Sequence, residues 1–177
     1  MKHVITAIFI LGIIAIIAFG ISNIQNKQNS PNTESLLRIH IRANSNSISD
    51  QDVKYKVKER VVETLSPLLT NISTKKDAIG ILRTNIKLIE KTADLTLLAN
   101  GFNYVCKAEI KEENFPTRVY DGITVPEGIY DALILNLGSG AGDNWWCVVY
   151  PPLCFIQNES QKVTYRSIIA EWLLGGG

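Results

Sequence analysis

Two cysteines and two tryptophans lie close together near the C-terminal end of this 177-residue chain. Cys147 and Cys154 bracket the dipeptide Pro151-Pro152, and they are two of the three cysteines in the sequence. In an oxidising compartment such a pair closes a small ring and usually serves as a structural staple. We therefore predict a Cys147–Cys154 disulfide. Cys106, alone on the inward face of an expected strand, is predicted to be a buried, small apolar residue.

The two tryptophans, Trp145 and Trp146, occupy consecutive positions of an expected strand, so their side chains point to opposite faces. An outward tryptophan beside Asp143 and Asn144 has the composition of an interface hot spot. The alternative is that both rings fill the core. Together with Tyr150, these four residues form the candidate partner-binding surface.

Candidates for nucleophilic, acid–base or metal chemistry are few. His40 stands between Arg38 and Arg42 on the polar face of an expected strand, and it is the one histidine outside the first few residues. The like charge of the arginines lowers its pKa, and no orienting carboxylate lies nearby in sequence, so we expect a solvent-facing residue. A single histidine without Cys-x-x-Cys spacing provides no zinc site. No catalytic, metal-binding or cofactor-binding residue is predicted.

Two further features resemble functional motifs. The run Gly138–Gly142 lacks the Lys-Ser/Thr pair of a phosphate-binding loop, and a tryptophan-rich strand comes after it instead of a helix. We therefore expect a flexible hairpin connection. Asp121, Asp131 and Asp143 could supply an acid pair for glycosidic hydrolysis, but their spacing does not fix two carboxyl groups at the required separation. Turn positions are the favoured interpretation of all three.

These residues need a scaffold, and hydrophobic periodicity in the first half of the chain predicts a strand and two helices. Residues 36–43 alternate apolar and polar side chains, as a half-buried strand does. A helix comes next and ends or kinks at Pro67. A second, amphipathic helix runs from about residue 74 toward Gly101, with a break near Thr92 as an alternative.

In the second half, turn signals separate short runs of strand-forming residues. Period two returns at residues 102–111, and further strands are expected at residues 118–120, 123–125, 129–137 and 145–150. The run 129–137 is apolar enough to be a central strand. Residues 163–174 are predicted to form a short C-terminal helix. This order predicts an α+β fold: an N-terminal strand and two helices, then a mainly antiparallel sheet with a stapled Trp-Trp hairpin.

The N-terminal residues indicate export. Lys2 precedes the run from Val4 to Ile21, which carries no charged side chain. Such a run lies at the boundary between a signal peptide and a membrane anchor, and the preceding positive charge places the remainder of the chain outside the cytoplasm. We expect a signal peptide or signal anchor at residues 1–21, a flexible polar linker at residues 22–35 and a single extracytoplasmic domain at residues 36–174.

Charge adds a further constraint. The chain has 18 basic and 17 acidic residues, a balance that does not favour nucleic acid as a partner. Residues 119–161 contain acidic side chains but no lysine or arginine. Such an asymmetry usually describes solvated faces that attract each other across the fold, and the alternative is a partner-facing acidic surface. If both tryptophans belong to the core, the basic first helix with Lys54 and Lys58 is the alternative contact.

Several blocks of sequence resemble the stage II sporulation protein R family. The most specific block is residues 142–155, GDNWWCVVYPPLCF. The others are Arg42–Ser47 with Asp50-Gln51 shortly after, then Phe115–Thr117, Pro126–Ala132 and, near the end, Glu171-Trp172. The resemblance extends from about Leu36 to Phe155. The chain departs from the family pattern in ending soon after Trp172, and Cys106 lies outside the shared blocks.

The resemblance implies a function. Proteins of that family are made in the forespore and exported into the space between the forespore and mother-cell membranes. There they trigger a membrane-embedded aspartic protease that processes pro-sigma-E. We therefore expect an exported signalling protein without catalysis, whose partner is that protease and which contacts the membrane only through an uncleaved N-terminal segment. No cofactor, nucleic acid or small-molecule substrate is expected.

Two other classes of protein compete with this interpretation. One is an extracytoplasmic cell-wall hydrolase that uses Asp143 as an acid. The other is a wall-binding module that stacks sugars on Trp145, Trp146 and Tyr150. The lack of a base next to a nucleophile in the sequence argues against the hydrolase, and a wall-binding module would be expected to bind purified peptidoglycan by itself.

Overall fold

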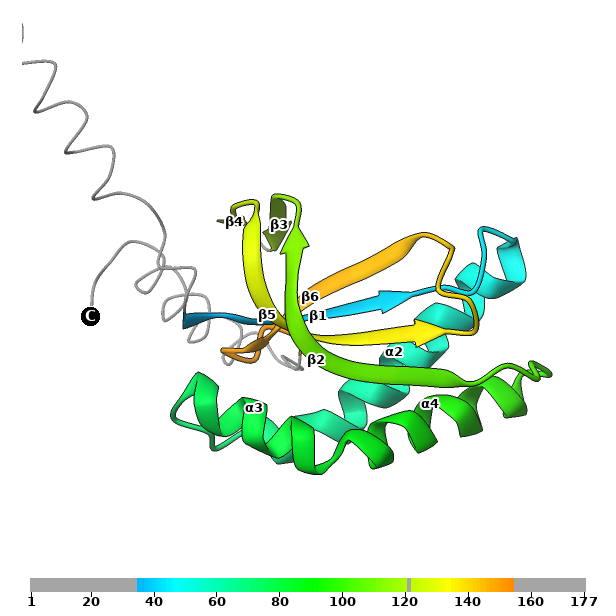
Figure 1. The fold of residues 1–177 in the computed structure, drawn as a ribbon, viewed down its shortest axis with the longest axis horizontal. Coiled ribbons are helices and arrows are strands. Elements are labelled where there is room, and N and C mark those ends of the chain that lie inside the picture. Colours follow the sequence, from blue (N-terminus) through cyan, green and yellow to red (C-terminus); the bar gives the residue numbers. More distant parts are fainter. Residues whose placement is uncertain (1–34, 121, 155–177) are drawn as a thin grey trace, which may run out of the picture.

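The structure is a computed structural model that describes residues 35–120 and 122–154 (Figure 1). Its elements are, in chain order, β1 (Leu37–Arg42), α2 (Ile48–Leu69), α3 (Lys75–Thr84), α4 (Ile86–Ala99), β2 (Cys106–Phe115), β3 (Arg118–Tyr120), β4 (Ile123–Val125), β5 (Gly128–Leu137) and β6 (Asn144–Tyr150). The predicted α+β class is confirmed. The predicted signal segment, the predicted linker before Ser35 and the predicted C-terminal helix lie outside the described residues.

The sheet has the strand order β2-β5-β1-β6. β5 is central, as predicted, and it pairs antiparallel with β2 and parallel with β1. β6 pairs antiparallel with the other side of β1. The predicted hairpin of β5 and β6 is therefore wrong, because the N-terminal strand lies between them. Neighbours along the chain often pair, and only the tertiary fold reveals an inserted strand.

Helix α2 begins at Ile48. Ser47 is its N-cap, and its hydroxyl oxygen accepts a hydrogen bond from the Asp50 amide at 3.1 Å. Pro67 does not end the helix, which continues to Leu69. A proline in the last turn deprives only one carbonyl, that of Glu63, of its helical partner, and Glu63 lies on the exposed side of the helix.

The second predicted helix is two helices, and the break lies at Asn85, not near Thr92. Asn85 leaves helical geometry (φ −101°, ψ 12°), and its side-chain amide donates to the Ile81 carbonyl at 2.9 Å. The same carbonyl also accepts the backbone N–H of Asn85 at 3.0 Å, so the side-chain amide adds a second bond at the end of α3. The helix is continuous at Thr92, whose carbonyl accepts a bond from the Thr96 hydroxyl at 2.8 Å.

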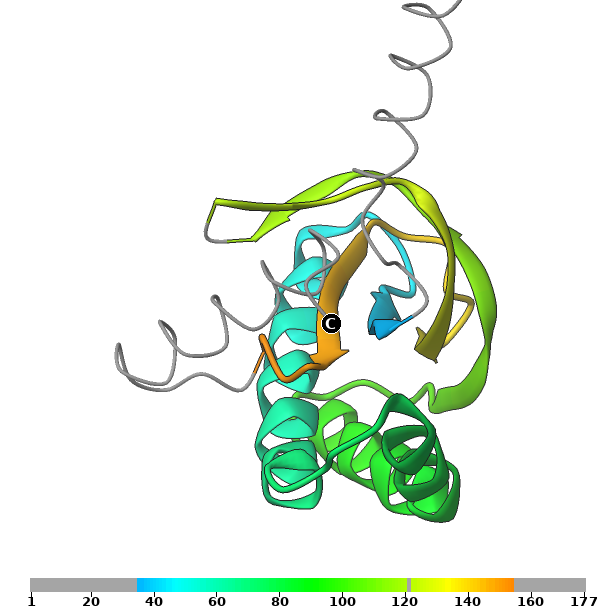
Figure 2. The same cartoon turned by 90° about the vertical axis from the view of Figure 1, so that its left-hand side faces the viewer.

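Apolar side chains fill both sides of the sheet. One cluster lies between the sheet and the helices, and a second contains Leu36, Phe115, Tyr130 and Val148. Figure 2 shows α3 and α4 on one side, while β2 and β5 curve over the other. β1 is therefore covered on both faces, so the predicted half-buried strand is wrong: Arg38 and His40 are buried, at 0% and 4% exposure.

Within residues 35–120 and 122–154, no helix is long and apolar enough to cross a membrane.

Candidate functional site

The tryptophan strand β6 is the centre of the candidate surface. Trp145 packs against the cluster on the helix side, and Trp146 packs against the cluster on the opposite side. The prediction that the two side chains point to opposite faces is confirmed. Neither ring is wholly inside or outside, because both are partly buried. Each face of the sheet therefore presents one tryptophan ring near its edge.

A cation lies over each tryptophan ring. The Lys58 ammonium lies 5.9 Å from the centroid of Trp145, and the Arg118 guanidinium lies 4.0 Å from that of Trp146. Such contacts are favourable by about 0.5–1 kcal/mol at exposed sites. Residues 119–161 contain no lysine or arginine, but in the fold Lys58 of α2 and Arg118 of β3 lie beside β6. The surface around β6 is of mixed charge, so the alternative of a partner-facing acidic surface is wrong.

The two polar residues before the tryptophans are exposed. Asp143 donates its backbone N–H to Asn46 Oδ1 at 2.6 Å, and its carbonyl accepts a bond from Lys54 Nζ at 3.0 Å. Lys54 is only 1% exposed. It holds the start of β6 onto α2 and is no free contact residue, in contrast to the alternative that the sequence suggested.

Tyr150, the fifth candidate residue, lies in the core at 5% exposure. Its hydroxyl donates to the Ser73 carbonyl at 2.7 Å. The structure thus brings Asp143, Asn144, Trp145 and Trp146 together at the surface and separates Tyr150 from them. Periodicity could not reveal this, because β6 becomes buried along its length as it passes beneath the rest of the fold.

The glycine run before β6 is tightly packed. The Ser139 amide donates to Asn44 Oδ1 at 2.9 Å, and the Ser139 hydroxyl donates to the Asn44 carbonyl at 2.6 Å. A Cβ atom on Gly142 would overlap the backbone of Ser45, and one on Gly138 (φ +57°) would overlap the Asn44 amide. The predicted flexible connection is therefore wrong. The glycines allow a close crossing of two backbones, a role that their composition cannot distinguish from mobility.

Asp50 anchors the other side of this crossing. Its carboxylate accepts bonds from Asn44 Nδ2 (3.0 Å), from the Ser45 hydroxyl (2.5 Å) and from the Tyr104 hydroxyl (2.6 Å). Burial raises the pKa of Asp50, but these bonds outweigh it and hold the pKa below its ordinary value. The Arg42–Ser47 motif and Asp50 thus have a structural role: they fix the loop against which the glycine run and β6 begin.

A buried polar cluster, which the sequence did not reveal, surrounds His40. Its Nδ1 lies 3.4 Å from Glu113 Oε2, and Glu113 also pairs with Arg42. Burial lowers the pKa of His40, and the opposing contacts with Asn144 and Glu113 do not restore it. The solvent-facing prediction is wrong. The carboxylate beside His40 is that of Glu113 in β2. Because Glu113 is far from His40 in sequence, the local pattern did not indicate this contact.

Arg38 extends this cluster. It is fully buried, and one of its terminal nitrogens donates to the Tyr120 hydroxyl at 2.7 Å. Its guanidinium lies 4.2 Å from the ring centroid of Phe115 and 4.9 Å from that of Tyr130. Its other nitrogens, Nε and Nη1, make no hydrogen bond within the described residues. Aromatic faces thus replace much of the water that a buried guanidinium loses.

The aspartates that could form an acid pair are not brought together. Asp131 lies opposite Leu37 at the start of β1 and pairs with Lys75 at 2.7 Å. Asp143 bonds to Ala43, beyond the opposite end of β1. Asp121 is outside the described residues. Within those residues, no group of three or more His, Cys, Asp or Glu side chains could hold a metal ion.

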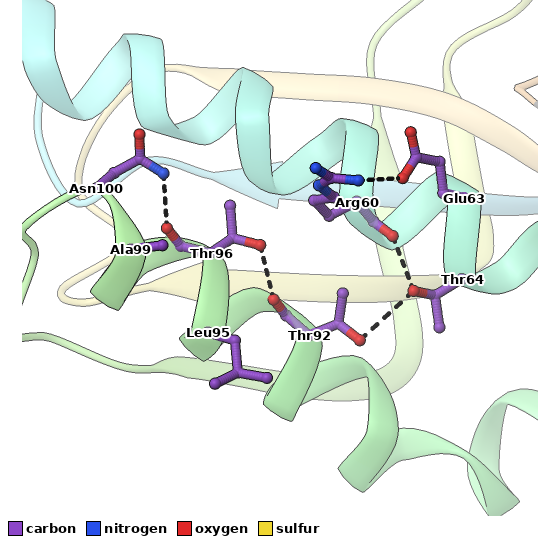
Figure 3. Close-up of a pocket in the computed structure, with 8 residues that line it drawn as sticks. All are labelled: Arg60, Glu63, Thr64, Thr92, Leu95, Thr96, Ala99 and Asn100. Atoms are coloured by element: carbon purple, nitrogen blue, oxygen red, sulfur yellow. Dashed lines mark hydrogen bonds and ion pairs between the residues drawn. The ribbon is translucent and has the colours of Figure 1, made fainter.

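The groove between α2 and α4 has a volume of about 480 Å³ (Figure 3). Its lining residues are Arg60, Glu63, Thr64, Thr92, Leu95, Thr96, Ala99 and Asn100. The hydroxyls of Thr64 and Thr96 donate to carbonyls of their own helices at 2.8 Å. Arg60 pairs with Glu63 at 2.9 Å. The polar groups that line the groove are thus largely paired with each other, and this groove lies away from β6.

The three cysteines divide as predicted. Cys147 and Cys154 form a disulfide, which joins β6 to the turn after it. Cys106 is free and buried. Burial, with further contributions from Asp94 and Glu90, raises the pKa of its thiol to about 12, so it stays protonated and poorly nucleophilic.

The fold and surface thus define an α+β domain in which four of the five predicted contact residues, Asp143 to Trp146, lie at one edge of the sheet. A family model described as stage II sporulation protein R matches residues 33–160. Stage II sporulation protein R of Bacillus subtilis (strain 168) is 32% identical over 123 residues, which are 70% of this chain and 55% of that protein. The chain therefore spans about half the length of this curated relative. No solved structure matches.

The chain belongs to the stage II sporulation protein R family.

Proposed function

We propose that the chain is an exported signalling protein that triggers a membrane-embedded aspartic protease to process pro-sigma-E in the mother cell. Family membership supports this proposal. The uncharged run from Val4 to Ile21 after Lys2 supports export, to the space between the forespore and mother-cell membranes. The protein would remain anchored there if the N-terminal segment is uncleaved, and would be released if it is cleaved.

The contact surface that we propose is the exposed start of β6, consisting of Asp143, Asn144, Trp145 and Trp146. The observation that carries this proposal is the combination of two half-buried tryptophans with exposed polar neighbours on a rigid support. Large aromatic rings in a fixed, partly desolvated position are typical of interface hot spots. The clamped glycine crossing and Lys54 keep this surface in one conformation, which lowers the entropic cost of binding.

The two competing functions receive less support. A hydrolase acting through an acid pair would need Asp131 and Asp143 together, yet they lie near opposite ends of β1. A sugar-stacking platform would need its rings on one face, whereas Trp145 and Trp146 lie on different faces and Tyr150 is buried. We therefore propose a binding function without catalysis.

The direct test is co-expression of the full chain with the protease and pro-sigma-E in a host that lacks sporulation genes. We expect cleavage of pro-sigma-E only when all three are present and the chain is exported. A chain whose residues 1–21 are deleted is the matched control, because it leaves the domain in the cytoplasm. Equal cleavage with and without the chain would exclude the proposed function, and binding to purified peptidoglycan alone would favour the wall-binding module.

A further inference from the structure

The last strand of the sheet has an open backbone edge. β6 pairs with β1 on one side, and no described strand lies on its other side. Its residues, NWWCVVY, include no charged side chain and no proline. Exposed edge strands usually carry lysine, proline or a cover that prevents pairing with another chain. β6 has none of these devices within its own sequence.

The register shows which backbone groups face outward. The Ala43 amide donates to the Asp143 carbonyl at 3.4 Å, so residue 143 is a hydrogen-bonded position of the β1–β6 pair. Antiparallel pairs alternate between bonded and non-bonded positions, so Trp145 and Cys147 also bond to β1. The amides and carbonyls of Asn144, Trp146 and Val148 therefore point away from β1.

The Val148 carbonyl confirms that these backbone groups point away from β1. The Val148 carbonyl accepts a bond from the Cys154 amide at 3.3 Å, on the side away from β1. The disulfide turn thus closes the edge at its C-terminal end. The amides and carbonyls of Asn144 and Trp146, together with the Val148 amide, form the open stretch.

The surroundings of this stretch indicate what would pair with it. Arg118 lies over Trp146 on one face of the sheet, and Lys58 lies beside Trp145 on the other. A strand added to β6 would therefore have a cation and a tryptophan ring beside it on each face. Side chains of an extended segment alternate between the two faces, so carboxylates on that segment would meet both cations.

We propose that an extended, acidic segment of the partner protein adds to β6 as a further strand of the sheet, held by backbone bonds to Asn144 and Trp146. The inference rests on the proposed function, because it assigns this segment to the activated protease. In such strand addition the backbone bonds provide affinity, and the side-chain contacts on either face provide specificity.

The test compares two substitutions at one position, Trp146→Ala and Trp146→Pro. Both remove the ring, and only proline removes the outward amide, which is the kind of site where a strand tolerates proline. Cleavage of pro-sigma-E is measured on co-expression with the protease. We expect the proline variant to be at least about tenfold less active than the alanine variant, with a similar melting temperature, since a backbone bond is lost and the proline ring obstructs pairing.

Trp145→Pro is the control for register, because it removes an amide that bonds to β1 and should lower the melting temperature strongly. Equal cleavage by the two Trp146 variants would overturn strand addition, and it would leave the proposed function standing if both are less active than the unmodified chain. If both match the unmodified chain, the proposed surface fails as well.

Amide hydrogen exchange supplies an independent measurement on the full, unsubstituted chain. We expect the Trp146 amide to exchange at least about tenfold more slowly when detergent-solubilised protease is added. Unchanged exchange would overturn the proposal. Protection of the Trp146 amide in the chain alone would also overturn it in two cases. If deletion of residues 155–177 removes that protection, the edge pairs within the chain. If the protection increases with chain concentration, the edge pairs with a second copy.

Discussion

The two edge strands of the sheet, β2 and β6, differ in how their outward backbone groups are protected from pairing with another chain. At the β2 edge, carboxylates of α4 accept the outward amides: Asp94 from Cys106 at 2.6 Å, and Glu90 from Ala108 at 3.1 Å. β2 also carries several charged side chains. At the β6 edge, no charged side chain of the strand and no described helix provides such cover for Asn144 and Trp146. Within residues 35–120 and 122–154, one edge is thus protected and the other is free along a short stretch.

The open edge of β6 is held in place by contacts at both of its ends. The disulfide turn holds its C-terminal end, and the crossing of Gly142 over Ser45 holds its N-terminal end. A strand edge that is fixed at both ends can bind a partner without first becoming ordered. Substitutions that remove one of these supports, or the cover of β2, should weaken the contrast between the two edges.

Loss of the disulfide should have the largest effect on stability. Replacing Cys147 and Cys154 with serine should lower the free energy of unfolding by about 2–3 kcal/mol, since the ring no longer restricts the unfolded chain. Denaturant unfolding of the exported protein measures this. Thiol counting on unfolded, non-reduced protein should find one free thiol, that of Cys106; three free thiols would contradict the disulfide.

Gly142→Ala should act at the other end of β6. The added Cβ would overlap the Ser45 backbone, so the crossing must shift, and we expect a loss of about 2 kcal/mol in the free energy of unfolding. Gly80→Ala is the matched control, because nothing lies within 4 Å of the added Cβ and the site is helical. That change should stabilise the protein by up to about 1 kcal/mol. Similar results for both variants would show that the crossing is loose.

Removing the cover of β2 should make the two edges alike. Asp94→Ala and Glu90→Ala each leave an outward amide of β2 unpaired, at an expected cost of about 1 kcal/mol. The double variant should also self-associate more readily, because β2 becomes an available edge. Sedimentation measures association, and Glu90→Gln, which keeps an acceptor oxygen, should behave like the unmodified chain. A double variant that stays as stable and as monomeric would show that these carboxylates do not protect the edge.

A weaker effect on stability concerns pH. Burial lowers the pKa of His40 below its usual value of 6.5 in the folded protein, so the unfolded chain binds a proton on this side chain more readily. Stability should therefore decrease as pH falls below about 6.5, and His40→Gln should remove this part of the decrease. Urea unfolding at about pH 7.5 and pH 5.5 measures it. The same decrease in the variant would exclude His40 as its source.

Hydrophobic periodicity and turn residues predicted much of the fold. The strands at residues 118–120 and 123–125, the central strand β5 and the opposite orientation of the two tryptophans are all confirmed, because they depend on local patterns. The insertion of β1 between β5 and β6 could not be predicted, since it depends on contacts far apart in sequence. For the same reason the solvent-facing prediction for Arg38 and His40 is wrong: residues of β2, β3 and β5 cover them.

The candidate surface shows the same limit. Asp143, Asn144, Trp145 and Trp146 lie together because they are adjacent in sequence, whereas Tyr150 is buried in the core, where its hydroxyl donates to the Ser73 carbonyl. The cations beside the tryptophans, Lys58 and Arg118, come from other elements and gave no local signal. The glycine run illustrates a different limit: glycine is required both where a chain is mobile and where two backbones touch.

The start of β6 is the activating surface that we propose, and the effect of Trp146→Ala on pro-sigma-E cleavage is its decisive test. Cleavage is compared with the fraction of folded chain, obtained from thermal unfolding of the same variant. Leu98→Ala is the matched control, because that residue is an exposed apolar side chain on α4, remote from β6. We expect Trp146→Ala to reduce cleavage at least about 30-fold beyond any loss of folded protein, equivalent to about 2 kcal/mol, while Leu98→Ala leaves cleavage unchanged. Cleavage that depends only on the folded fraction in both variants would contradict the proposed surface.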